Sequence, residues 1–364
     1  MNLPLALLTI RWMVRETFRQ SLASRLFWVM LGISLISALF CLSVSVSGDT
    51  RLPTSDSDIE LRLSQTAIDE LGREKSRSAP GVHLVGGGLG LQLSADALGR
   101  EVARSEGIDA PGGRVTFGFG VFEAPLGRDR RDAVRWLEII LAGAVADTIG
   151  LFLVLIWTAG FVPTFFDPNQ ATILLAKPVP RWSLVVGKFV GVLIFVGLQA
   201  GVFVGLTWLA LGAATGVFDP TYLLTVPLVI IHFAIFYSFS VLLGIWTRNA
   251  VICVLGTILF WAMCWGMNFA RHAVIAHQVD NTSVKSSMML EVGYWVLPKP
   301  GDMSIVVFQV LKDGSVPDSA FPVPEFAAVL NKKVVYPELS MLASLAFSAL
   351  MLAIAARELH QVDY

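Results

Sequence analysis

The chain has 364 residues, of which 55% are hydrophobic and only 15% charged, against about 25% charged residues in an ordinary soluble domain. Its 27 Lys and Arg and 28 Asp and Glu leave a net charge of −1, without the basic excess that nucleic-acid-binding proteins use to meet phosphate. The cysteines Cys41, Cys253 and Cys264 lie in apolar runs, which disfavours a disulfide scaffold or a zinc site. A soluble globular protein and a nucleic-acid partner are therefore excluded, and a lipid bilayer is expected.

Residues Leu5 to Leu22 have the pattern of an amphipathic helix at a membrane surface. Arg11, Arg15 and Arg19 recur every fourth residue, and the apolar residues follow a separate stripe. We expect a cytoplasmic interfacial helix over residues 1–25, held by anionic lipid headgroups.

Six apolar blocks are long enough to cross a bilayer, whose core of about 30 Å requires roughly 20 helical residues. They cover residues 26–47, 137–161, 189–213, 222–246, 250–269 and 339–356. Trp and Tyr residues near several ends fit the headgroup level. The first block exceeds the roughly 7 to 15 apolar residues of a signal peptide, so we interpret it as an anchor.

The basic residues near the short connections predict the orientation of these spans. Arg residues precede the first span, Lys and Arg lie between spans two and three, and Arg248 lies between spans four and five. Because such residues favour the cytoplasmic side, both termini are predicted to be cytoplasmic, including a tail over residues 357–364. Arg271, Lys332 and Lys333 oppose this orientation, but their segment exceeds the roughly 60 residues over which the rule is informative.

Two segments are then extracytoplasmic. Residues 48–135 should form a small α+β domain, with helical spacing over Leu61–Lys75 and strand-like alternation over Arg114–Phe122. In residues 270–338, Met288–Leu297 and Ser304–Leu311 are apolar but too short to span, so we expect re-entrant or interfacial pieces. The predicted fold is an all-α polytopic membrane protein carrying this insertion.

No pattern of a catalytic or cofactor site stands out in the sequence. The phosphate-binding G-x-x-x-x-G-K-[ST], the H-E-x-x-H and the G-x-S-x-G motifs are absent, and the glycine run at residues 86–90 lacks the spacing of a dinucleotide loop. His272 and His277 are five residues apart, which aligns them poorly on a helix for metal binding. We expect a non-catalytic chain without its own cofactor or metal.

Two ionisable residues lie inside predicted spans. Asp147 and His232 each lie ten residues into a span, where charged groups are costly and usually face the interior of the bundle. They could belong to a substrate or proton path, or they could be packing residues that need only one hydrogen-bond partner, which we favour. A proton relay would need a chain of polar groups, and Gln199 and Asn268 give only weaker signals.

The loop over residues 162–188 predicts a short helix outside the bilayer. Asp167 can cap a helix that begins at Pro168 and ends before Pro178, with an apolar face at residues 173–175. Because that face would otherwise be exposed, a protein partner or the membrane surface should cover it.

The same loop carries the run LLAKPVPR at residues 174–181, followed by GKFVG at residues 187–191. Together they resemble the LL-x-K-P-x-x-R … G-K-x-x-G signature of ATP-binding cassette (ABC) type 2 permeases, six-span subunits related to the nitrous-oxide-reductase maturation permease. An interfacial helix, six spans and an interrupted outer segment are the topology that this resemblance implies. The insertion at residues 48–135 is larger than the minimal family pattern.

The resemblance implies a coupling helix that docks on a separate ATPase, which would bind ATP and Mg. The residues that would transmit ATPase closure are Asp167, Pro168, Asn169, Gln170, Lys177, Pro178 and Arg181. It also implies a second permease copy or homologue and a place in the bacterial cytoplasmic (inner) membrane. Alternatively, Lys177, Arg181 and Lys188 could pair with anionic lipid.

The leading hypothesis is therefore the permease subunit of an ABC exporter, whose substrate the sequence leaves open. One alternative is an ion-coupled secondary transporter that uses Asp147. The other is a membrane-anchored interaction protein whose extracytoplasmic domain binds a partner.

Overall fold

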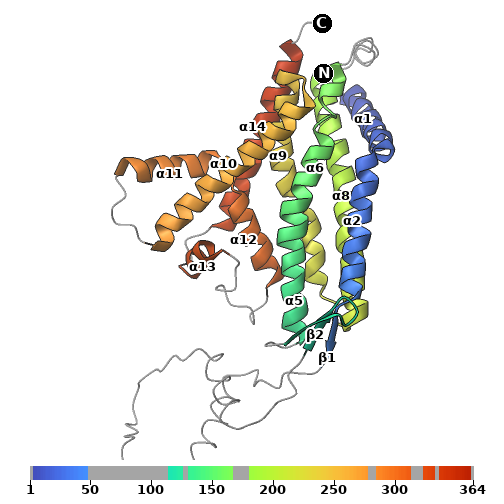
Figure 1. The fold of residues 1–364 in the computed structure, drawn as a ribbon. Coiled ribbons are helices and arrows are strands. Elements are labelled where there is room, and N and C mark those ends of the chain that lie inside the picture. Colours follow the sequence, from blue (N-terminus) through green and yellow to red (C-terminus); the bar gives the residue numbers. More distant parts are fainter. Residues whose placement is uncertain are drawn as a thin grey trace, which may run out of the picture. The chain divides into compact units, whose positions relative to one another are not determined.

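The computed structural model describes residues 3–47, 114–125, 130–166, 180–277, 284–312, 323–332 and 336–361. These residues fall into two compact units, one comprising Met1–Leu42 with Val134–Tyr364 and the other Ser43–Ala133. The structure is mostly helical (Figure 1). Its longer helices are α1 (Leu3–Ala23), α2 (Arg25–Leu42), α5 (Arg130–Ile140), α6 (Leu151–Thr158), α8 (Arg181–Thr215), α9 (Thr225–Thr247), α10 (Ala250–His277), α11 (Val284–Val296), α12 (Pro300–Leu311), α13 (Pro324–Asn331) and α14 (Pro337–Gln361).

Six helical stretches among the described residues are long and apolar enough to cross a membrane. They are Arg25–Leu42, Ala133–Thr158, Arg181–Thr215, Pro220–Thr247, Ala250–Ala276 and Pro337–Gln361. Each contains most of one block that the sequence predicts. The described part of the chain is therefore that of a multi-pass membrane protein.

Some helices begin or end at other residues than predicted, because the apolar block and the helix do not cover the same residues. The third span, α8, begins at Arg181 rather than at residue 189. Lys188 interrupts the apolar run, but it is buried inside the helix. The first span, α2, ends at Leu42, before the predicted end at residue 47. Ser45–Ser47 form strand β1.

Helix α9 is the most buried of the six and packs against α8, α10 and α14. Aromatic rings fill this contact: Tyr237 stacks on Phe189 of α8 and on Phe233 of its own helix, with ring centroids 5.6 and 5.0 Å apart. Only 11, 17 and 22% of the apolar stretches in α2, α10 and α14 is buried. Large apolar side chains such as Trp28, Leu259 and Leu342 are exposed on them. In a bilayer such faces meet lipid tails or another chain without cost.

Helix α1 packs tightly along α8 through two glycines (Figure 1). A Cβ atom at Gly187 would lie 3.1 Å from the Cα of Ile10, and one at Gly191 would lie 3.1 Å from the Cα of Val14. Small residues four apart let two helix backbones approach closely. The GKFVG run therefore has a structural role here, because its glycines hold the amphipathic helix against the third span.

The smaller unit contains a three-stranded antiparallel sheet in the order β1-β2-β3, with β2 at Arg114–Phe117 and β3 at Phe122–Pro125. The single strand predicted over Arg114–Phe122 is wrong, because the chain reverses at residues 118–121. Gly118 and Gly120 adopt positive φ angles of 63° and 93° there, which glycine tolerates and which the apolar alternation hides. The helix predicted at residues 61–75 and the glycine run at 86–90 lie outside the described residues.

Between the fifth and sixth spans the chain forms α11, α12 and α13. The first two overlap the short apolar pieces predicted at residues 288–297 and 304–311. Helix α12 begins at Pro300, a favoured first position, and packs against α9, α10 and α14. This contact places the polar start of α12 inside the helical bundle.

Candidate functional site: a buried polar network

The second span changes its helical period where Asp147 lies. Residues Leu141–Gly150 (η1) form a π-helix between α5 and α6. The Thr148 hydroxyl donates to the Gly143 carbonyl five residues earlier, at 3.0 Å, in keeping with the wider turn. Because π-helical segments are rare and frequently occur at functional sites, this segment marks Asp147.

Asp147 and His232 are hydrogen-bond partners. His232 Nδ1 lies 2.6 Å from Asp147 Oδ1, and the two residues are 2% and 1% exposed. The hydroxyl of Ser304 is 3.5 Å from the other carboxylate oxygen. An ionised Asp147 accepts a hydrogen bond from the Nδ1–H group of His232. If His232 is neutral, its Nε2 is then a hydrogen-bond acceptor. That Nε2 is buried and has no partner among the described residues.

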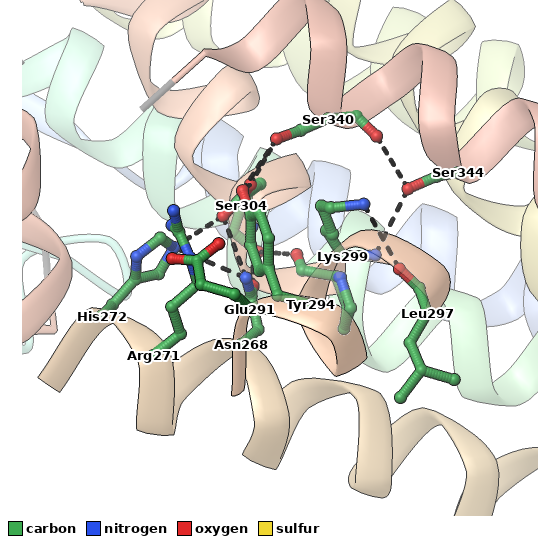
Figure 2. Close-up of polar contacts among 12 residues, drawn as sticks. Asn268, Arg271, His272, Glu291, Tyr294, Leu297, Lys299, Ser304, Ser340 and Ser344 are labelled. Carbon is green, nitrogen blue, oxygen red and sulfur yellow. Dashed lines mark hydrogen bonds and ion pairs between the residues drawn. The ribbon is translucent and has the colours of Figure 1, made fainter. Parts of the chain in front are cut away.

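A second carboxylate, Asp302, lies in the first turn of α12. Its hydrogen-bond partners include His272, Tyr294 and Ser340, which Figure 2 shows. Asp302 is 1% exposed and accepts hydrogen bonds from four side chains. The donors are His272 Nε2 at 2.7 Å and Asn268 Nδ2 at 3.0 Å to Oδ1, and Ser340 Oγ at 2.6 Å and the Tyr294 hydroxyl to Oδ2. A buried carboxylate with this many donors is fully satisfied as an anion.

Four helices supply this cluster. Asn268 and His272 are one turn apart on α10, whereas Tyr294 comes from α11 and Ser340 from α14. Asn268 also accepts from the backbone N–H of Asp302 at 3.0 Å, so its side chain satisfies an N–H group at the start of α12. The helix dipole favours the negative charge of Asp302 at that position.

The pKa of Asp302 reflects two opposing effects. Burial raises the pKa, but hydrogen bonding and charge from His272, together with the Ser340 and Tyr294 hydroxyls, outweigh burial and lower it from 3.8 to about 2. The nearby Lys299 is also buried, and burial lowers the pKa of its ammonium group although Asp302 opposes this. Its Nζ lies 4.9 Å from the centroid of the Tyr294 ring.

One small cavity adjoins both aspartate–histidine pairs. Its volume is about 10 Å³, close to the size that holds one water molecule. Its lining includes the polar side chains of His232, Lys299, Asp302, Ser340 and Ser344. The remaining lining is mostly apolar.

Of the residues predicted to contact an ATPase, the structure describes Arg181. Its Nη1 donates to the carbonyls of Leu359 and His360 at 3.2 Å each, at the end of α14. Arg181 therefore ties the start of α8 to the end of α14. The other predicted coupling residues, Asp167, Pro168, Asn169, Gln170, Lys177 and Pro178, lie outside the described residues.

Lys188, the alternative lipid-binding residue, is buried. Its Nζ donates to Gln20 of α1 and lies 4.8 Å from the Phe161 ring centroid. These contacts fix α8 to α1.

Sequence reasoning singled out Asp147 and His232 separately and missed their contact. It missed the Asp302 cluster as a site, because His272 was compared only with His277 and Asp302 lies just before the short apolar segment 304–311. A usable signal was present: a lone acidic residue directly after Pro300-Gly301, at the start of an apolar helix that packs inside a membrane protein.

The chain matches no protein-family model and no curated protein. Among the described residues no group of three or more His, Cys, Asp and Glu side chains could hold a metal ion.

Proposed function

We propose that this chain is the membrane-spanning permease subunit of an ABC exporter in the bacterial cytoplasmic membrane. Both termini would lie in the cytoplasm, and a separate ATPase subunit would bind ATP and Mg. A second copy or homologue would complete the transport path. The observation that carries the proposal is the packing of α1 on α8 through Gly187 and Gly191, directly after the loop that resembles a coupling helix.

This packing gives the loop a means of moving the spans. The loop over residues 167–179 leads into α8, and α8 is held to α1 by the glycine contact and by Lys188. Arg181 adds the end of α14 to the same body. A push on the loop from a docked ATPase would therefore move three helices together.

The test is purification of the full chain from its native membrane in mild detergent, with identification of co-purifying proteins and an ATPase assay. We expect a stoichiometric ATPase, lost by at least tenfold in Lys177→Glu and kept in the charge-preserving Lys177→Arg. Absence of any ATPase in preparations that preserve other membrane complexes would contradict the proposal. So would equal ATPase recovery with the two variants.

A second candidate function is an ion-coupled secondary transporter. It is favoured by the Asp147–His232 pair in the π-helical segment, because buried ionisable pairs in spans often lie on ion paths. Purified chain in sealed vesicles would then move substrate on an imposed pH gradient without ATP. The permease hypothesis predicts that such vesicles need the ATPase partner and ATP.

A further inference from the structure

The cavity beside His232 has the size and the polar lining residues that a site for one exchangeable proton requires. Its volume of about 10 Å³ fits one water molecule, and a buried water requires two to four polar partners. His232 Nε2 is a buried nitrogen without a partner among the described residues, on a residue that lines the cavity. Asp302 and Ser340 supply polar groups on the same cavity.

The two carboxylates differ in how many neighbouring groups compensate their negative charge. Asp302 has four donors and Lys299 nearby, so it is stable as an anion. Asp147 has one ionisable neighbour within hydrogen-bond distance among the described residues, His232. An uncompensated carboxylate is costly inside a membrane protein, and the Asp147–His232 pair is electrically neutral only when it holds two protons. With Asp147 ionised, these protons lie one on each ring nitrogen of His232.

We propose that Asp147 and His232 bind and release one proton at His232 Nε2, through a water in the cavity beside Asp302. In the loaded form Nδ1–H donates to Asp147, and Nε2–H donates to the water. On release the Nε2 proton passes to that water and exchanges with bulk solvent. The Nδ1 proton stays on His232 and keeps its hydrogen bond to Asp147. This site does not depend on the proposed ATPase partner, and it would add a proton-dependent state to either transport function.

The surrounding charges predict how the site responds. The ionisable side chains around it on the neighbouring elements are Asp302 of α12, Lys299 before it, His272 and Arg271 of α10, and Tyr294 and Glu291 of α11. Arg271 and Glu291 pair with each other at 3.0 Å, so their charges largely cancel. Asp302 and Lys299 remain as the two cavity-lining charges, of opposite sign.

The test uses the full chain in lipid nanodiscs, with isotope-labelled histidine followed by NMR during a pH titration. The His232 signal is assigned by its loss in His232→Gln. We expect this signal to titrate. Asp302→Asn should shift the midpoint of this titration, because it removes an anion that lines the cavity. Lys299→Gln should move the midpoint in the opposite direction.

The matched control is Asp219→Asn, which removes another ion-paired carboxylate, 2.9 Å from Arg135, that does not line the cavity. It should leave the His232 midpoint unchanged. A His232 signal that does not titrate while the protein stays folded would overturn the proposal, and so would identical responses to Asp302→Asn and Lys299→Gln. If Asp302→Asn does not fold, the wild-type titration and Lys299→Gln still decide.

Discussion

At the scale of single residues, the buried carboxylates show how a membrane protein keeps acidic groups in an apolar bundle. Asp302 collects four donors at a helix start, whereas Asp147 depends chiefly on His232. The first arrangement stabilises a fixed anion, and the second leaves a proton as the main source of charge balance. The two carboxylates therefore have different expected roles, Asp302 in holding four helices together and Asp147 in proton binding.

The lowered pKa of Asp302 makes stability depend on pH. A carboxyl group whose pKa is lower in the folded than in the unfolded protein stabilises the fold above the unfolded value and loses this contribution as pH falls through the folded value. We expect the difference in thermal stability between wild type and Asp302→Asn to be nearly constant above about pH 5 and to shrink steadily as pH falls to about 2 and below.

Thermal unfolding in detergent at a series of pH values measures this difference directly. Using the variant as the reference cancels the other carboxylates, which titrate in both proteins. A difference that stays constant throughout this range would show that Asp302 is not ionised in the folded protein.

At the scale of elements, close approach of α1 and α8 depends on two positions without a side chain. A Cβ atom at Gly191 would lie 2.9 Å from Thr17 Oγ1 and 3.1 Å from the Cα of Val14. The second contact is with backbone, so a side chain could be accommodated only by moving α1. The predicted membrane-surface helix is therefore part of the bundle.

Gly191→Val should weaken this contact. We expect a loss of about 1 to 3 kcal/mol in stability and faster proteolysis within α1, as is typical of overpacking a close contact. The matched control is Gly201→Val on the same helix, where nothing lies within 4 Å of the added Cβ atom. Thermal unfolding and limited proteolysis of the two variants side by side make the measurement, and equal behaviour of both would contradict the assigned role of Gly191.

At the scale of the whole molecule, the described residues contain six helices long and apolar enough to cross a membrane, and helix α1 precedes the first of them. Six crossings would place the two termini on one side of the membrane. The distribution of Arg and Lys on the short connections predicts that this side is the cytoplasm.

Reporter fusions that are active only in the cytoplasm should therefore work at both termini. The same reporter inserted at residue 219, in the short acidic connection between α8 and α9, should be inactive. Activity at one terminus alone would require an odd number of crossings and would contradict the six-span topology.

The sequence by itself determined the class of protein, the six apolar segments and the short pieces between the last two, because a bilayer requires long runs of apolar residues whatever their neighbours. Helix ends were less predictable. Lys188 looks like a loop residue until its contact with Gln20 shows why it is buried in α8. The sequence also does not distinguish a glycine that reverses a strand from a glycine that lets two helices pack closely.

Only the tertiary structure decided which polar residues meet. Asp147 and His232 are 85 positions apart, and Asp302 draws its partners from three other helices. Side-chain pairing across helices depends on rotation and packing, which local sequence patterns do not encode. The buried polar network therefore became visible only when the helices were assembled.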